Sequence, residues 1–377
     1  MTQPFSIAIV AGARPNFMKI APIVRALNAR KKDAAAAGID LRVSIVHTGQ
    51  HYDENMSEVF FRELAIPKPD HHLEVGSGTH AEQTARIMIA FEKVLQMDRP
   101  AWVVVVGDVN STIACTLTAK KMGVKVAHVE AGLRSFDMTM PEEINRKLTD
   151  AICDLLFVTE QSGIRNLRNE GVAQEKIVLA GNVMIDTMMT NLARIDDGEF
   201  VPPESLRAFC VGRRYAVLTL HRPSNVDRIE TLGPIWDALS EVARRIPILF
   251  PVHPRTRAKI DAFGLNGTDI TMIDPVGHLE MLYVVRGAEL VLTDSGGLQE
   301  ETTVLGVPCI TIRESTERPV TVDIGTNNVV GTNPDKIEAV AFEILLGQRN
   351  KGAIPPLWDG NAAERIATSI LSSTDVK

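Results

Sequence analysis

The segment from Ile7 to Pro22, IAIVAGARPNFMKIAP, predicts a buried strand, a tight turn and a helix in succession. Gly12 allows the sharp turn, and a helix that begins just after it presents backbone N–H groups and a positive dipole end to an anion. Arg14 can grip a phosphate through its planar fork, and Lys19 lies one turn into the helix. The segment is neither a Walker A nor a GxGxxG loop. It therefore predicts a phosphate site of another kind, the alternative being an ordinary strand-end turn with two solvated cations.

The same strand-and-helix rhythm continues along most of the chain. Each expected strand is a near-continuous apolar run, which suits parallel strands buried on both faces. The expected strands are Ser6–Val10, Leu41–His47, Trp102–Gly107, Lys125–Val129, Leu155–Thr159, Lys176–Leu179, Tyr215–Leu220, Ile248–Val252, Ile270–Ile273, Leu290–Thr293 and Cys309–Ile312. Strands separated by helices predict doubly wound α/β sheets.

The length of 377 residues favours two domains over one. The strand rhythm breaks after Leu179 and restarts at Tyr215, and the segment 191–214 has the weak periodicity of a surface connection. We therefore expect two Rossmann-like domains, residues 1–180 and residues 181–358, that face each other across a cleft. Ligands bind at the carboxyl ends of the strands in such sheets.

Composition excludes several classes of protein. The net charge of −7 argues against nucleic-acid binding, which needs a basic surface. No apolar run reaches the roughly 18 residues that span a membrane, and the start of the chain reads as a strand rather than a signal peptide. The four cysteines lack CxxC spacing and predict buried thiols in a reducing compartment. We therefore expect a cytoplasmic protein.

Acidic residues follow two neighbouring strands of the first half. Asp108 and Glu130 come directly after such strands, and Glu142 and Arg146 follow Pro141. Clustered carboxylates are what proton transfer requires. The alternative is that Asp108 caps the next helix and Glu142 occupies the first turn of another.

The second half carries different residues at its expected strand ends. His221 and His253 are each followed within two residues by an arginine, which favours contacts with phosphate or hydroxyl groups over simple helix caps. Ser295, Gly296 and Gly297 place N–H groups at a helix start, ready for a phosphate. Glu301 lies on that helix, where its carboxylate can accept hydrogen bonds from ribose hydroxyls. HxxxH metal spacing and a GxSxG elbow are both absent.

Together these residues resemble the non-hydrolysing UDP-N-acetylglucosamine 2-epimerases. The resemblance runs from Gly12 to about Gly331. Its markers are GARPNFMKIAP, TGQHYDENMS, GDVNST, HVEAGLRS, MPEEINR, LTLHRPSNVD, PVHPRT, LTDSGGLQEE and RESTERP. It implies the two-domain GT-B architecture, with a C-terminal helix in residues 359–377 that packs back on the first domain. It also implies a homodimer and a reaction without metal or redox cofactor.

The resemblance implies a role for each of these residues. UDP leaves C1 of the sugar as the C2 proton is removed, and re-addition to the resulting glycal inverts C2. The implied catalytic residues are Asp108, Glu130, Glu142, His221 and Lys19. The implied UDP-sugar-binding residues are Arg14, Arg146, His253, Ser295, Gly296, Gly297, Glu301 and Arg318.

One departure from the family pattern bears on activation of the enzyme, and another bears on the identity of its substrate. Tyr52 and Asp53 replace residues typical of members that a second substrate molecule activates, so we do not expect that activation here. Pro223, Ser224 and Asn225 follow the His221-Arg222 pair in place of the usual residues, which leaves a related UDP-diacetamido-uronic acid open as substrate. A hydrolysing epimerase, a glycosyltransferase and a non-catalytic UDP-sugar sensor are further alternatives.

Overall fold

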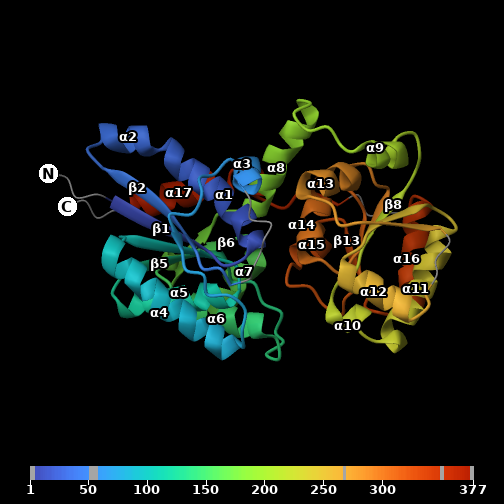
Figure 1. Cartoon of the computed structure of the whole chain (residues 1–377), viewed down its shortest axis with the longest axis horizontal. Helices are drawn as coiled ribbons and strands as arrows, with labels where there is room; N and C mark the ends of the chain where they lie inside the picture. Colours follow the sequence, from blue (N-terminus) through green and yellow to red (C-terminus); the bar gives the residue numbers. More distant parts are fainter. Residues whose placement is uncertain (1–4, 51–57, 266–268, 349–351, 374–377) are drawn as a thin grey trace. The chain divides into compact units, whose positions relative to one another are not determined.

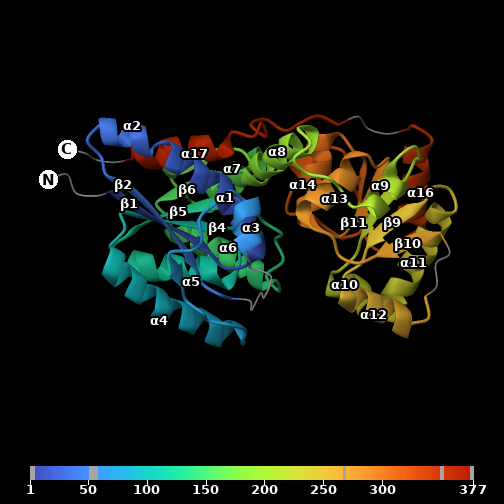
Figure 2. The same ribbon diagram turned by 45° about the horizontal axis from the view of Figure 1, so that its top comes forward.

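The computed structural model describes residues 5–50, 58–265, 269–348 and 352–373. The chain divides into two compact units (Figures 1 and 2). Unit 1 contains Met1–Thr187 and Pro356–Lys377, and unit 2 contains Met188–Pro355. The helix α8 (Val183–Asp196) contains the boundary.

Each unit is built on one parallel sheet in the described part of the chain. The sheet of unit 1 has the order β3-β2-β1-β4-β5-β6-β7. Its strands are β1 (Phe5–Ala11), β2 (Leu41–His47), β3 (His71–His72), β4 (Trp102–Val106), β5 (Lys125–Ala131), β6 (Leu155–Val158) and β7 (Ile177–Leu179). The sheet of unit 2 has the order β10-β9-β8-β11-β12-β13. Its strands are β8 (Ala216–Thr219), β9 (Ile248–Pro251), β10 (Ile270–Ile273), β11 (Leu290–Thr293), β12 (Cys309–Thr311) and β13 (Asn327–Val329).

Helices cover both faces of each sheet. Those assigned to unit 1 are α1 (Arg14–Ala29), α2 (Lys31–Ala36), α3 (Glu58–Glu63), α4 (His80–Asp98), α5 (Asn110–Lys121), α6 (Pro141–Ile152), α7 (Gln161–Asn169) and α17 (Ala362–Ser372), with a 3₁₀ turn at Gln174–Lys176. Those of unit 2 are α9 (Glu204–Cys210), α10 (Pro223–Val226), α11 (Ile229–Ala243), α12 (Pro254–Ala262), α13 (His278–Arg286), α14 (Gly296–Leu305), α15 (Val320–Asp323) and α16 (Pro334–Leu345).

Strand β1 shows why the strand sequences are apolar throughout. Ile7 and Ile9 pack on one side with α1 and α17, whereas Ala8 and Val10 pack on the other side with α4 and α5. Successive side chains of a strand point to opposite faces, so a strand covered on both faces has no position for a solvated residue. Figure 2 shows α17 lying beside α1, although the two helices lie at opposite ends of the chain.

The strand order defines one switch point in each sheet. In unit 1, β1 pairs with both β2 and β4, and later strands run outward from β4. In unit 2, β8 pairs with both β9 and β11. Crevices at such switch points are the usual ligand sites of open parallel sheets. The topology therefore selects the residues after β1 and β4, and those after β8 and β11.

The predicted fold class, two α/β units with parallel sheets, is confirmed, and every expected strand is present within two residues at each end. Two strands were missed, β3 and β13. Both lie at a sheet edge, and they contain histidine or asparagine in place of an apolar run. The segment 191–214 is also more ordered than expected, because it contains the end of α8 and all of α9. Gly198, with φ +75°, follows the end of α8.

Candidate functional site

The centre of the unit 1 site is an ion pair between Lys19 and Glu130. Lys19 lies on α1, and Glu130 lies near the end of β5, 111 residues away in the chain. The Lys19 side chain is 16% exposed and the Glu130 side chain only 2%. An ammonium group from helix α1 and a carboxylate from strand β5 are thus held together in a mostly buried position.

The backbone at Glu130 is strained. Its φ of +70° lies in the left-handed region, which a non-glycine residue adopts at a cost of about 1–3 kcal/mol. The register between β5 and β6 shifts between Val129 and Ala131, so the strand bulges at this residue. Gly107, directly after β4, has no side chain to occupy this space; a Cβ there would lie 3.1 Å from Lys19 Nζ. Backbone strain of this kind, with open space kept beside the side chain, is typical of a functional residue.

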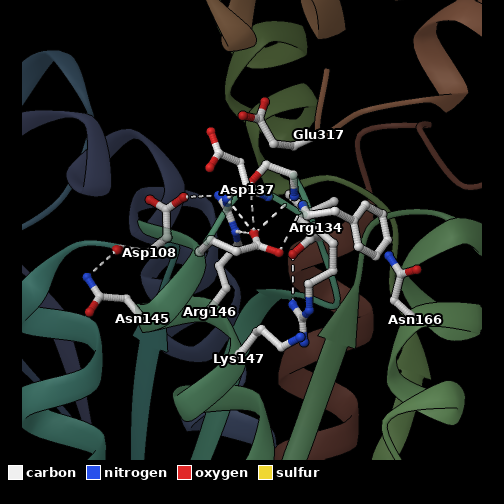
Figure 3. Close-up of polar contacts among 12 residues, drawn as sticks. Asp108, Arg134, Asp137, Asn145, Arg146, Lys147, Asn166 and Glu317 are labelled. Carbon is white, nitrogen blue, oxygen red and sulfur yellow. Dashed lines mark hydrogen bonds and ion pairs between the residues drawn. The ribbon is translucent and has the colours of Figure 1, made fainter. Parts of the chain in front are cut away.

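A second ion pair links Asp108 to α6. Arg146 donates from Nη1 to Asp108 Oδ2 at 2.6 Å (Figure 3). It also donates from Nη2 to Glu143 Oε2 at 2.8 Å. Asn145 donates to the main-chain carbonyl of Asp108 at 2.8 Å. The Asp108 side chain remains 32% exposed, whereas that of Arg146 is 5% exposed. Arg146 therefore orients a carboxylate that solutes can reach.

Two adjacent glutamates of α6 have different surroundings. Glu142 is exposed on the first turn, whereas Glu143 is buried. Glu143 accepts hydrogen bonds from the N–H groups of Ser135 and Phe136. Burial by itself raises the pKa of Glu143, but the Ser135 N–H and the Arg146 guanidinium outweigh this effect, so the pKa lies below its usual value. Glu143 thus anchors the preceding loop, and Glu142 is the accessible acid.

The turn after β1 is more closed than the sequence suggested. Asn16 accepts hydrogen bonds from the N–H groups of Gly12 and Ala13, at 3.1 and 3.0 Å, so these amides already have an acceptor. Gly12 is packed against Ser111, since a Cβ at Gly12 would lie 2.6 Å from Ser111 Oγ. Arg14 is exposed on the first turn of α1. Arg14 and Lys19 are thus the cations that this turn offers to an anion.

The corresponding position in unit 2 is organised by Asp294, at the end of β11. This buried carboxylate lies 2.8 Å from His221 Nδ1 and accepts the main-chain N–H groups of His221 and Arg222. Burial raises the pKa of Asp294, but the hydrogen bond and ion pair with His221 outweigh this effect, so the pKa lies below its usual value. The His221 side chain is 52% exposed. Asp294 therefore holds the end of β8 and leaves the imidazole accessible.

Helix α14 begins beside an arginine. Ser295 is its N-cap, and Gly296 and Gly297 are its first residues. Arg318 packs so closely on Gly296 that a Cβ there would lie 2.8 Å from Nη1. At Gly297 a Cβ would meet no atom of the described residues within 4 Å, apart from its chain neighbours and the backbone of its own helix. Arg318 Nε donates to Glu300 Oε1 at 2.5 Å. A helix start and a guanidinium together form a suitable anion site.

Glu301 and His253 each have a partner that the sequence did not indicate. Glu301 is buried and lies 2.9 Å from His278 Nε2, and His278 Nδ1 in turn contacts Asn191. Burial lowers the pKa of His278, but the Glu301 carboxylate more than offsets it, so the pKa is raised. His253 is exposed and caps α12 by accepting the N–H of Arg255.

Sequence reasoning missed Glu143, His278 and a buried pair formed by His128 of β5 and Asp150 of α6. The Glu143–Arg146 pair had a signal, since residues three apart on a helix are neighbours. The other contacts join residues of different elements, which no spacing along the chain connects. The predicted departure at Tyr52 and Asp53 lies outside the described residues. Among the described residues, the structure contains no group of three or more His, Cys, Asp or Glu side chains suited to a metal ion.

Comparison with known proteins identifies the family to which the chain belongs. The model of the UDP-N-acetylglucosamine 2-epimerase family matches residues 33–371. The UDP-N-acetylglucosamine 2-epimerase of Methanocaldococcus jannaschii is 43% identical over 96% of this chain and 97% of its own length. Its crystal structure in complex with UDP-GlcNAc and UDP has a TM-score of 0.83 to this chain, covering 97% of it and 99% of the crystallised chain. The UDP-2,3-diacetamido-2,3-dideoxy-D-glucuronate 2-epimerase of Pseudomonas aeruginosa is 41% identical over 96% of this chain and 98% of its own. The chain therefore belongs to the UDP-N-acetylglucosamine 2-epimerase family.

Proposed function

We propose that this enzyme interconverts UDP-N-acetylglucosamine and UDP-N-acetylmannosamine by elimination of UDP and its re-addition. The observation that carries this proposal is the pair of carboxylates, Asp108 and Glu130, at the carboxyl ends of adjacent strands, each ion-paired with a cation. Simple binding of a UDP-sugar, a dianion, gains nothing from such acids, which argues against a sensor. The same acids argue against a glycosyltransferase.

The chemistry needs an acid, a base and support for the leaving group. C2 of the sugar has no neighbouring carbonyl, so its proton is not acidic. A base takes this proton as the C1–O bond breaks, and the electron pair of that bond leaves with the diphosphate. The glycal then accepts a proton at C2 on the opposite face, and UDP returns to C1. General acid–base catalysis and preorganised charge supply the rate.

The residues divide by unit in this proposal. Asp108, Glu130 and Glu142 exchange protons with the sugar, and Lys19, Arg14 and Arg146 stabilise the charge that develops. In unit 2, His253, Ser295, Gly296, Gly297, Glu301 and Arg318 hold UDP, and His221 assists at the diphosphate or sugar. The exposure of His221 and the arginine beside the start of α14 support these assignments.

Incubation with UDP-N-acetylglucosamine in D₂O tests the proposal. Deuterium at C2 together with UDP-N-acetylmannosamine in the proton NMR spectrum is the expected result. Free UDP growing in step with free sugar would instead indicate hydrolysis. Absence of any exchange, with UDP still bound, would support the sensor.

A second substrate is favoured by the relative from Pseudomonas aeruginosa, whose name gives a diacetamido-glucuronate. The test is a comparison of kcat/KM for that UDP-uronate and for UDP-N-acetylglucosamine. We expect the N-acetylglucosamine substrate to have the larger value. The reverse order would assign the enzyme to the uronate.

The assembly and location of the enzyme are part of the same proposal. We infer a cytoplasmic homodimer that supplies surface polysaccharide precursors. The free thiols of Cys115, Cys153, Cys210 and Cys309 support a reducing compartment. No helix in the described residues is long and apolar enough to cross a membrane. Light scattering on the purified protein reads the oligomeric state, and a monomer mass would refute the dimer.

A further inference from the structure

His128 is a fully buried histidine on β5, two residues before Glu130. Its Nδ1 lies 2.6 Å from Oδ1 of Asp150 on α6. Its Nε2 lies 2.8 Å from the main-chain carbonyl oxygen of Gly107 at the end of β4. Both ring nitrogens therefore have a partner at hydrogen-bond distance.

The partners determine where the protons are. A carbonyl oxygen can only accept, so Nε2 must carry a proton. Asp150 accepts the N–H of Gly132 at 3.0 Å and lies 2.7 Å from Arg134 Nη2. Because the Arg134 guanidinium and the Gly132 N–H can only donate, Asp150 is a carboxylate, and Nδ1 of His128 must donate to it as well. The ring is an imidazolium.

The surrounding charges allow a buried cation at this position. Arg134 also forms a two-point contact with Glu170, at 2.9 and 2.6 Å, and Lys147 lies 3.4 Å from Glu170. The side chains of His128, Asp150 and Arg134 are each at most 1% exposed. Cations and anions alternate along this chain of contacts, so each buried charge has an opposite neighbour, without which its desolvation would be prohibitive.

The imidazolium fixes the backbone next to both candidate catalytic acids. On one side it holds the carbonyl of Gly107, which is joined by a peptide bond to Asp108. On the other side Asp150 holds the N–H of Gly132, just beyond the strained bulge at Glu130. Loss of either contact would release the backbone beside one of the two candidate catalytic acids, Asp108 or Glu130.

We propose that His128 is a positioning residue protonated at both ring nitrogens, whose two donated hydrogen bonds set the geometry of Asp108 and Glu130. The kinetic part of this inference rests on the proposed epimerase function. His128 does not touch the substrate and exchanges no proton with it. Its contribution is the alignment of the groups that do.

The charge of the ring is tested without reference to catalysis. With histidines labelled by ¹⁵N, we expect both ring nitrogens of His128 to appear as N–H in the folded protein, because each faces an acceptor. His128→Gln assigns the signal among the nine histidines. If this variant does not fold, neutron diffraction from a deuterated crystal reads both nitrogens in the unaltered protein. A single ring proton by either method overturns the proposal.

The positioning role is tested by kinetics of the folded variant. We expect His128→Gln to lower kcat about a hundredfold, the loss that a misplacement of about 1 Å causes, with the Kd of UDP unchanged. The matched control is His71→Gln, which removes a histidine–aspartate contact of the same 2.6 Å on the edge strand β3 and should leave kcat unaltered. Equal kcat in His128→Gln and the unaltered enzyme would overturn the role. An unaltered enzyme with no activity on any UDP-sugar would refute the epimerase function, while the protonation result would stand.

Discussion

The two units share a topology but differ in what they place at its switch point. In unit 1 the strand ends carry acids paired with side-chain cations, Glu130 with Lys19 and Asp108 with Arg146. In unit 2 the acid at the strand end, Asp294, is buried and is used to hold main-chain N–H groups. The neighbouring helix starts with two glycines rather than with functional side chains.

The residues at the strand ends therefore suit two different functions on the same sheet topology. A parallel sheet supplies a crevice at its switch point whatever the sequence. Reachable acids beside cations suit proton transfer, whereas a bare helix start beside an arginine suits a bound anion. Variants of the reachable acids of unit 1 should therefore change kcat, and variants of Glu317 and Glu301 in unit 2 should change stability or affinity.

The largest effect is expected from Glu130→Gln in unit 1. The amide keeps the shape of the side chain but cannot take a proton, so kcat should fall by about 10³-fold. Deuterium exchange at C2 measures the rate, and calorimetry should show unchanged UDP binding. Glu160→Gln, a buried glutamate after the next strand β6, is the control and should retain activity. Retained exchange in Glu130→Gln would remove this residue from the catalytic set.

Glu317 of unit 2 should instead contribute to the free energy of unfolding. Burial raises the pKa of Glu317, but the Arg313 hydrogen bond and charge, with Arg318, lower it from 4.5 to about 2. A lowered native pKa contributes stability that is present above pH 4.5 and is lost as the pH falls toward 2. At about 1.36 kcal/mol per pKa unit, this contribution is at most about 3 kcal/mol.

Urea unfolding across this pH range measures that contribution. Glu317→Gln should be less stable than the unaltered protein at pH 6, and the gap should narrow as the pH is lowered. A gap that stays constant with pH would show that Glu317 does not titrate differently in the folded state.

The adjacent glutamates of α6 sharpen the comparison within unit 1. Glu143→Gln removes the partner of a buried arginine and should lower the free energy of unfolding by about 2 kcal/mol. Glu142→Gln, at an exposed position, should leave stability unchanged and lower kcat. Thermal unfolding and kinetics on both variants decide the assignment. Normal turnover in Glu142→Gln would make Glu142 a surface residue only.

The smallest effect is expected from Glu301→Gln in unit 2. Loss of one charged hydrogen-bond acceptor for the ribose should raise the Kd of UDP about tenfold, with kcat little changed. Calorimetry with UDP measures this. A tenfold fall in kcat without a change in affinity would show that Glu301 takes part in the chemical step, and its assignment to UDP binding would fail.

Much of the fold is predictable because its signals are local. A strand buried on both faces must be apolar along its length, and this requirement identifies β1, β4 and β11 directly. Edge strands need no such run, so β3 and β13 were missed. Motifs such as HVEAGLRS and LTDSGGLQEE begin within or directly after an apolar run, and their order alone assigns the candidate residues to strand ends.

The sequence alone therefore specifies two parallel α/β units and a family, because periodicity and motif spacing depend on neighbouring residues. The tertiary structure decides which groups meet. Lys19 reaches Glu130 only because the strand order places β5 near α1, and Asn16 rather than an anion occupies the amides of the first turn. The two ring protons proposed for His128 are the clearest case, since they follow from an aspartate of α6 and a carbonyl just after β4 that no spacing along the chain connects.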